Sequence, residues 1–223
     1  MMRSKSHKRT YDASGRQAQA RETRRRILEA ARKLFTERGY AGATAEAIAS
    51  EASVSLQTVY AVFKNKKKIL VSLMNVSSPG GNEDHLPMRE RAGPRAMAEE
   101  RDQRRQLRIF TEIVAINLDQ VAAIFEIMTE AARTEPDLSR IVDRLNKQRL
   151  ENMALAVQQI AAHGPFREGI DEANALDIVW ALTSGEVFLL LTRERGWPKE
   201  KYAGWLADTL VHSLLPHDLA RPG

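Results

Sequence analysis

The chain has 223 residues, 43% of them hydrophobic, and 34 Lys and Arg against 29 Asp and Glu give it a net charge of +5. This length and composition allow a real hydrophobic core, which excludes a disordered tail or a disulfide-stapled miniprotein. The absence of cysteine excludes disulfides, thiolate metal sites and cysteine catalysis.

The charge is divided unevenly along the chain. Residues 1–70 contain 16 Lys and Arg and 6 Asp and Glu, a net charge of +10, while the remaining residues carry −5. A basic module attached to a mildly acidic body is typical of a protein that binds a polyanion, because neutralised phosphates release condensed counterions. On charge alone, the alternative is a basic surface that only aids solubility.

No membrane or export signal is visible in the sequence. No window approaches about 18 uninterrupted apolar residues, and no apolar stretch follows the basic residues at the start. We therefore expect a soluble cytoplasmic protein.

The N-terminal part predicts a basic arm followed by short helices. Residues 1–19, with Arg3 and Arg16 among their cations, are expected to form an unstructured arm that can reach the minor groove or neighbouring phosphates. Residues 20–65 are expected to form a three-helix domain. The first of these helices shows an apolar stripe with i, i+4 and i+7 spacing, and Gly39 is placed to end it.

Three polar residues are candidate caps for the helices that follow. Thr44 precedes a helix containing Ala49, Ser55 precedes the next one, and Asn65 precedes a connecting helix over residues 66–76. Strands are not expected anywhere, because no two-residue alternation of apolar and polar residues extends over a strand length.

The second and third helices have the spacing of a helix-turn-helix. A small residue in the first helix (Ala49), an apolar one in the turn (Val54) and another in the second helix (Val59) allow close packing of the two backbones. In this motif the second helix lies in the major groove of DNA. This geometry directs five side chains toward DNA: Ser55, Leu56, Gln57, Thr58 and Ala61.

Each of these side chains suits a particular contact with DNA. Gln57 can pair with adenine, Leu56 or Ala61 can contact a thymine methyl group, and Thr58 and Tyr60 can donate to phosphate. Four lysines follow and are expected to hold phosphate beside the groove: Lys64, Lys66, Lys67 and Lys68. Lysine at a helix start opposes the helix dipole, which is understandable if phosphate is the partner.

The run RRRILEAARKLFTERGYAGATAEAIASEASVSLQTVYAVFKNKKKIL resembles the N-terminal DNA-binding domain of the TetR family of transcriptional regulators. The resemblance implies that Thr44, Thr58, Tyr60 and Lys66 touch phosphate and that the residues around Gln57 select sequence. It also implies an all-α fold, with a homeodomain-like helix-turn-helix domain ahead of a helical ligand-binding and dimerisation domain, in about nine helices.

This chain departs from the family pattern in the turn between the two helices. Ser53 stands where the family usually has glycine, at a position expected to need a positive φ. Val62, Lys67 and Lys68 also replace residue types that are common in the family.

The C-terminal body is predicted to be helical. Residues 77–94, rich in Pro, Gly and Ser, are expected to form a surface loop before an effector-binding and dimerisation domain over residues 95–216. Its helices are predicted at residues 95–117, 119–134, 137–163, 171–195 and 198–214. The family resemblance extends to this body more loosely.

A homodimer is expected from the last two helices. The segment around Ile178, Leu182 and Leu190 is apolar around much of its circumference, which suggests burial against a second copy. The dimer surface is completed on the next helix by Trp205, Leu206, Leu210 and Leu214.

A small hydrophobic effector bound among the body helices is expected to shift the DNA-binding helices. The candidate lining residues are Phe110, Ile113, Val114, Phe125, Met128, Met153, Val157, Trp180, Thr183 and Phe188. Their apolar character predicts an uncharged or weakly polar ligand.

The sequence therefore predicts a repressor that binds a palindromic operator in double-stranded DNA as a dimer and is released by its effector. The alternative is a helical adaptor whose basic end binds acidic proteins or an anionic membrane. We expect no enzyme, cofactor or metal site, because no catalytic motif or ligand-like spacing of the five histidines is present.

Overall fold

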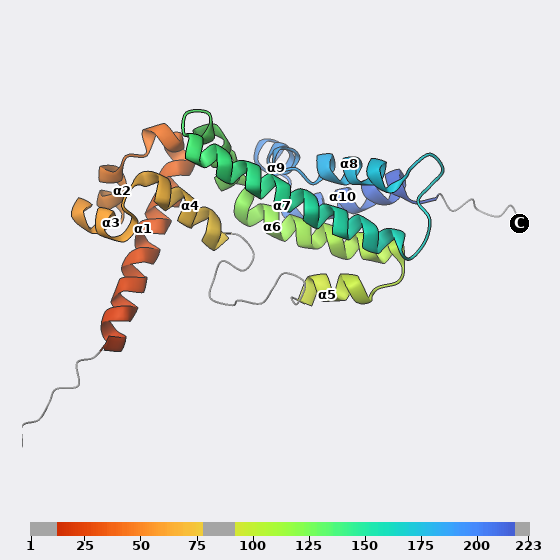
Figure 1. Cartoon of the computed structure of the whole chain (residues 1–223), viewed down its shortest axis with the longest axis horizontal. Helices are drawn as coiled ribbons and strands as arrows, with labels where there is room; N and C mark the ends of the chain where they lie inside the picture. Colours follow the sequence, from red (N-terminus) through yellow and green to blue (C-terminus); the bar gives the residue numbers. More distant parts are fainter. Residues whose placement is uncertain (1–12, 78–91, 217–223) are drawn as a thin grey trace, which may run out of the picture.

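The computed structural model describes residues 13–77 and 92–216. Within these ranges the chain forms ten α-helices and a short π-helix, with no strand, so the all-α prediction is confirmed (Figure 1). Most of the predicted arm and of the predicted loop 77–94 lie outside the described residues.

Four helices form the N-terminal head: α1 (Ala13–Gly42), α2 (Ala45–Glu51), α3 (Leu56–Phe63) and α4 (Lys66–Ser77). The predicted caps are confirmed, because the side chains of Thr44, Ser55 and Asn65 accept the backbone N–H groups of Ala47, Thr58 and Lys68. These bonds satisfy donors that a helix start leaves unpaired.

The first helix differs from the prediction at its start. It begins at Ala13, so residues 13–19, assigned to the unstructured arm, are helical. Ala, Gln and Arg dominate this stretch and are strong helix formers, which explains the extension without any buried face. At its other end the predicted stop is confirmed, since Gly39 leaves helical geometry with a φ of 67°.

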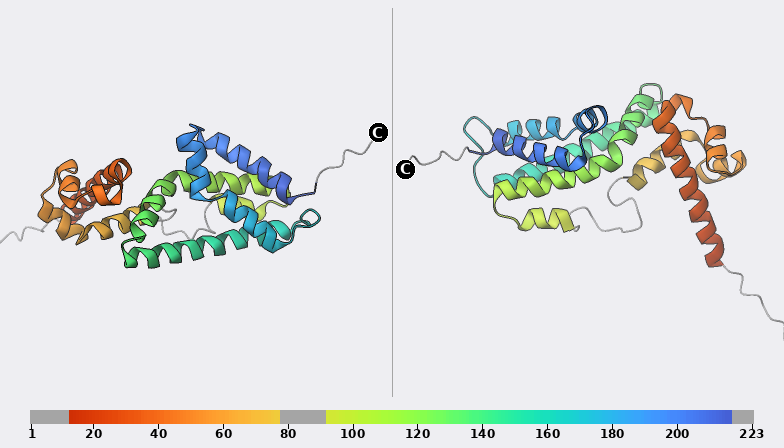
Figure 2. Two further views of the ribbon diagram at one scale, coloured as in Figure 1. Left: turned by 90° about the horizontal axis from the view of Figure 1, so that it is seen from above. Right: turned by 180° about the vertical axis from the view of Figure 1, so that it is seen from behind.

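The body contains α5 (Ala92–Glu99), α6 (Gln103–Ala132), α7 (Pro136–Ala161), α8 (Glu172–Leu182), α9 (Gly185–Leu189), the π-helix η2 (Leu190–Glu194) and α10 (Lys199–Leu214). Helices α6 and α7 both extend along the body and contact each other, and α10 lies along α6 (Figure 2).

Two predicted helix boundaries in the body are wrong. The predicted break between helices 95–117 and 119–134 does not occur, because α6 is continuous there. The chain turns earlier, at residues 100–102, where Asp102 caps α6 by accepting the N–H of Arg105 at 2.9 Å. The helix predicted over residues 171–195 breaks after Thr183, and Ser184 caps the new start by accepting the N–H of Val187. The turn at residues 100–102 contains no proline or glycine as a signal, whereas Gly185 directly follows Ser184 at the second break.

A single hydrophobic core joins the head to the near end of the body. Phe35 of α1 and Leu70 of α4 share this core, here called the junction core, with Met128 of α6 and Leu138 of α7, and all four are fully buried. Val59 of α3 belongs to the same cluster. The head therefore packs on the body rather than hanging from a linker.

A second core fills the rest of the body. It is formed by residues of α5 to α10, with Leu107, Val179, Tyr202 and Leu210 among its fully buried side chains. In the part of the chain described, no single helix is long and apolar enough to cross a membrane; α8 with the segment Gly185–Glu194, bent by 41°, meets that criterion only as a pair.

The junction core yields a stability prediction. Replacing Leu138 by alanine should lower the free energy of unfolding by about 2–5 kcal/mol, because a buried leucine leaves a cavity. Leu155 lies on the same helix with 58% of its surface exposed, so Leu155→Ala should change the free energy by less than about 0.5 kcal/mol. Urea titration of both variants measures this difference, and equal effects would contradict the assigned core.

Candidate nucleic-acid interface

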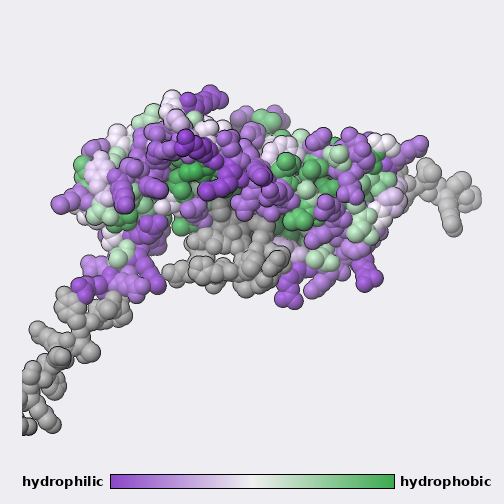
Figure 3. Space-filling model, viewed as in Figure 1, coloured by the Kyte–Doolittle hydropathy of each residue, from purple (hydrophilic) through white to green (hydrophobic). Residues whose placement is uncertain are grey.

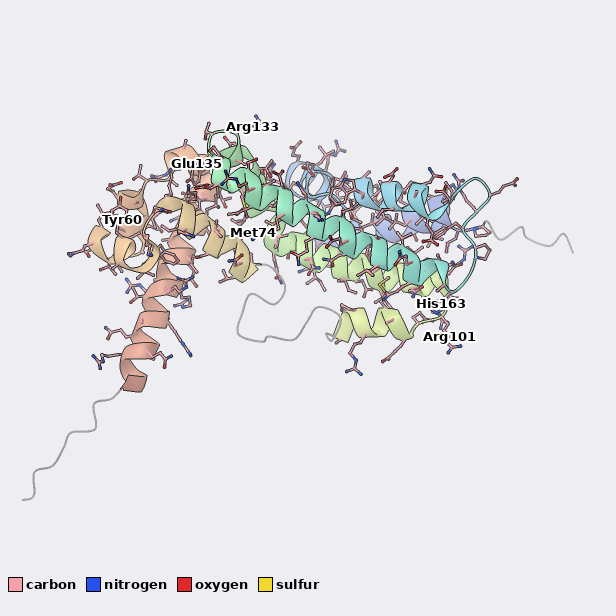
Figure 4. The ribbon with its side chains drawn as sticks, viewed as in Figure 1. Tyr60, Met74, Arg101, Arg133, Glu135 and His163 are labelled. Carbon is pink, nitrogen blue, oxygen red and sulfur yellow. The ribbon has the colours of Figure 1, made fainter. Side chains whose placement is uncertain are left out.

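Helix α3 has one buried and one exposed side. Val59 and Phe63 are 1% and 3% exposed and fix the helix to the junction core, whereas Tyr60 is 44% exposed. Figure 4 places Tyr60 at the end of the head away from the body. Gln57 and Ala61 are also exposed, so a polar strip of α3 is free to meet another surface.

The remaining predicted contact residues lie around this strip. Ser55, Lys64 and Thr44 are exposed, while Leu56 and Thr58 are half-buried. The hydroxyl of Thr58 lies 2.8 Å from that of Ser55, so the two form a pair at the start of α3. The structure thus brings Ser55 and Thr58 together at the start of α3, and contact of the other residues with DNA stays a prediction.

The turn before α3 has the geometry expected for Ser53. Its φ is 51°, and the N–H groups of Ser53 and Val54 donate to the carbonyls of Ser50 and Ala49, the pattern of a Schellman motif. Left-handed geometry costs a residue with a Cβ roughly 1–2 kcal/mol. The prediction of a positive φ is therefore confirmed, with a strained serine between the two helices.

Two arginines of α1 support this region and escaped the sequence prediction. The guanidinium of Arg24 lies 4.5 Å from the centre of the Phe63 ring and donates to Ser72 Oγ at 3.1 Å. Arg26 Nη2 donates to the carbonyls of Ala52 and Ser53. The sequence shows only a run of three arginines ahead of an apolar stripe, which gives no sign of these long-range contacts.

The lysines after α3 do not form one outward-facing cluster. Lys66 Nζ donates to the carbonyl of Tyr40 at 2.7 Å and lies 4.2 Å from the centre of its ring. Partial burial lowers the pKa of Lys66. Lys64 and Lys68 are exposed. Contact of Lys66 with phosphate stays a prediction, and in this structure its ammonium pins the end of α1 to α4.

Lys67 points to the body, contrary to its predicted place beside the groove. Its Nζ lies 2.6 Å from Asp137 Oδ2 and 3.5 Å from Glu135 Oε2 at the start of α7. Figure 4 shows Glu135 at the corner of the body next to the head. The hydrogen bond between Lys67 and Asp137 raises the pKa of Lys67 and lowers the pKa of Asp137. This ion pair therefore stays charged at neutral pH and weakens when acid protonates Asp137.

The predicted effector residues fall into separate places. Phe125 and Met128 belong to the junction core, because they lie at the end of α6 that contacts the head. The second core holds Phe110, Ile113, Val114, Met153, Val157 and Phe188. The structure therefore does not bring all the predicted lining residues together.

Trp180 and Thr183 surround an arginine that the sequence did not single out. The guanidinium of Arg149 lies 3.8 Å from the centre of the Trp180 ring, and its Nη2 donates to the carbonyl of Trp180 and the hydroxyl of Thr183. Burial lowers the pKa of Arg149. These contacts join α7 to the end of α8, where the chain breaks before α9.

Two polar surface hollows lie away from the predicted effector residues. One, of about 290 Å³, lies between α1 and the end of α2, and the other, of about 340 Å³, lies at the far end of the body near His163. Within the described ranges, no group of three or more His, Asp and Glu side chains could hold a metal ion.

The match to a known protein family lies in the head of this chain. Residues 27–73 match the family model described as bacterial regulatory proteins, tetR family. The HTH-type transcriptional repressor BepR of Brucella suis is 24% identical over 206 residues, which cover 88% of this chain and 94% of BepR. The uncharacterized regulator YvkB of Bacillus subtilis is 40% identical over 58 residues, a match to 26% of this chain and only 31% of YvkB.

Solved structures share the fold of most of this chain. NalD, the secondary repressor of the MexAB-OprM multidrug efflux pump in Pseudomonas aeruginosa, has a TM-score of 0.60 at 23% identity, with 89% of this chain and 98% of NalD covered. The regulator FadR of Bacillus subtilis, in complex with stearoyl-CoA, has a TM-score of 0.63 at 19% identity, with 84% and 97% covered.

The strained turn yields a prediction about Ser53. Ser53→Gly should raise the free energy of unfolding by about 1 kcal/mol, because glycine adopts a positive φ without a Cβ clash. Ser50→Gly, in helical geometry three residues earlier, should instead lower it by about 0.5 kcal/mol. Thermal unfolding of the two variants checks the opposite signs, and a loss of stability in both would contradict the strain.

Proposed function

We propose that this chain, which belongs to the TetR family of bacterial regulatory proteins, is a repressor that binds an inverted-repeat operator as a homodimer and leaves it when a small effector binds. It is a DNA-binding transcriptional regulator, and the proposal concerns how it binds and how it is controlled. The observation that carries it is the two-sided α3, whose apolar side is locked in a core while its polar side is exposed.

The exposed strip of α3 is suited to the major groove. Gln57 offers a donor and an acceptor in the fork that adenine pairs with, and Tyr60 and Thr58 offer hydroxyl groups to phosphate. Thr44 and Lys64 flank the strip and add phosphate contacts. The repressor BepR, similar over most of its length, supports repression as the outcome.

Selection of bound fragments from genomic DNA by the purified full chain tests this proposal. We expect enrichment of an inverted repeat whose half-site centres are separated by about one helical turn, 34–36 Å. The adaptor alternative predicts no enriched sequence and loss of binding in an excess of random DNA. Either of those results would overturn the repressor proposal.

Two side chains of α3 should have different effects on binding. Tyr60→Ala should weaken binding to every sequence, because the hydroxyl of Tyr60 is proposed to contact DNA phosphate rather than a base. Gln57→Ala should change the preference at one base position by about 1–3 kcal/mol. Fluorescence anisotropy with operator duplexes substituted at each position measures both, and an equal, sequence-blind loss would refute the role of Gln57.

The proposed dimer forms through the outer side of α8, η2 and α10. The sequence prediction included Leu206, Leu210 and Leu214, but these are fully buried in the chain's own second core and cannot contact a second copy. Leu190 is 50% exposed, and Trp205 is half-buried. An exposed leucine on η2 and a partly exposed tryptophan on α10 support an apolar contact.

Leu190→Asp should therefore convert the dimer into a monomer, because a charge would be buried without a partner. Leu155→Asp places the same charge on the exposed side of α7 and should leave the dimer intact. Sedimentation equilibrium at micromolar concentration distinguishes the two variants. Dissociation of the Leu155 variant instead would place the interface elsewhere.

The proposed effector acts through the junction between head and body. An apolar ligand among the second-core residues would shift α6 and α7, and α4 is tied to α7 by the Lys67–Asp137 ion pair and to α6 by the junction core. Because both ties end on α4, a shift of α6 and α7 changes the spacing of the two α3 helices in the dimer. The structural neighbour FadR, in complex with stearoyl-CoA, supports an effector with an apolar chain.

A prediction about Lys67 follows. Lys67→Gln should leave operator affinity within about threefold but reduce the effector-induced loss of affinity, because it removes the ion pair that ties α4 to α7. Allosteric coupling free energies are typically about 1–3 kcal/mol, so the loss of one tie should be measurable. Lys68→Gln, at an exposed neighbouring position, is the control. A thermal-shift screen of apolar molecules supplies the effector, and anisotropy with and without it measures the coupling. Unchanged coupling in the Lys67 variant would exclude this route.

A further inference from the structure

The connection between α2 and α3 depends on a residue of α1. Ser53 has a φ of 51°, and it lies only three residues before the first residue of α3, Leu56. Its backbone dihedrals therefore set the angle between the two helices, and with it the direction of the exposed side of α3.

Arg26 holds both peptide groups on either side of the Ser53 Cα. Its Nη2 donates to the carbonyl of Ala52 at 2.5 Å and to the carbonyl of Ser53 at 3.1 Å. One carbonyl precedes the φ bond of Ser53 and the other follows its ψ bond. A single nitrogen that binds both carbonyls therefore restricts both dihedrals at once.

The anchor of this contact is rigid. Arg26 is half-buried, and the next residue along α1, Ile27, is fully buried in the junction core. The two carboxylates that line the adjacent hollow bind other cations, with Glu29 2.5 Å from Arg25 and Glu51 2.8 Å from Lys33. The two carboxylates of the hollow thus have partners other than Arg26, and Glu22, whose charge also acts on Arg26, is hydrogen-bonded to Arg25.

We propose that Arg26 is a positioning residue for DNA recognition. It holds the left-handed turn at Ser53 and so fixes the direction of α3, and it determines operator selectivity without touching DNA. Glycine would adopt this turn without strain, so the arginine matters because the chain has serine there. This inference rests on the proposed recognition of DNA by α3.

The test compares Arg26→Gln with Arg25→Gln, which removes the same charge from the neighbouring residue of α1, in the native chain and in the S53G background. Anisotropy gives the dissociation constants for the selected operator and for a random duplex of the same length, at several salt concentrations. Thermal unfolding is measured in parallel.

R26Q should weaken operator binding about tenfold, leave random-duplex binding within about twofold, and keep the salt slope, because no phosphate contact is lost. R25Q should leave the ratio of operator to random binding unchanged. In the S53G background, R26Q should cost less than about threefold, because glycine removes the strain that Arg26 supports. If R26Q alone does not fold, the test becomes rescue: R26Q/S53G should fold and bind the operator within about threefold of S53G, and a double variant that stays unfolded or loses tenfold would separate Arg26 from Ser53.

Three results would overturn the role of Arg26 and leave the proposed function intact. An equal loss for operator and random duplexes with a smaller salt slope would make it a phosphate contact. A lower unfolding temperature with an unchanged operator-to-random ratio would make it only a stabilising residue. An equal tenfold loss in both backgrounds would separate it from Ser53. A native chain without any preferred sequence would instead overturn the proposed function, and this inference with it.

Discussion

The packing of α1 and α4 against the adjoining ends of α6 and α7 is the constraint on which the rest of the structure depends. Phe35, Leu70, Met128 and Leu138 are buried together there, so head and body cannot separate without exposing apolar surface. The Lys67–Asp137 ion pair lies at the edge of this core. A change in the body therefore reaches the head through packed side chains rather than through a loop.

The same core explains why α3 can act as a recognition surface. Val59 and Phe63 use its apolar side, and its polar side is left at the far end of the head. Figure 3 shows mostly hydrophilic side chains over the start of α1, which projects from the rest of the head. A helix held from behind presents its exposed residues in a fixed geometry, which sequence-specific recognition requires.

Much of the head was predictable from the sequence because local rules determine it. The caps Thr44, Ser55 and Asn65 and the positive φ of Ser53 depend on residues only a few positions away. The breaks at residues 100–102 and after Thr183 were not predictable in the same way. The cap Asp102 creates the first without a Pro or Gly signal, and only Ser184 and Gly185 mark the second. Helical periodicity alone could not place them.

The candidate site was predictable only in part. Exposure of Gln57 and Tyr60 follows from the amphipathic pattern of α3, but the partners of Lys66, Lys67 and Arg26 lie 26 to 70 residues away in sequence. The predicted effector residues are divided between two cores for a similar reason. Phe125 and Phe110 lie on one long helix that serves two cores, and the sequence does not show where one core ends.

Residue-resolved hydrogen exchange of the full chain, free and bound to its selected operator, tests the coupling of recognition to the body most directly. The account predicts slower exchange in α3 and also in residues 120–132 of α6, which pack on the head behind the DNA-binding side. Slower exchange confined to residues 44–68 would show a head that binds DNA independently of the body. That result would contradict the account.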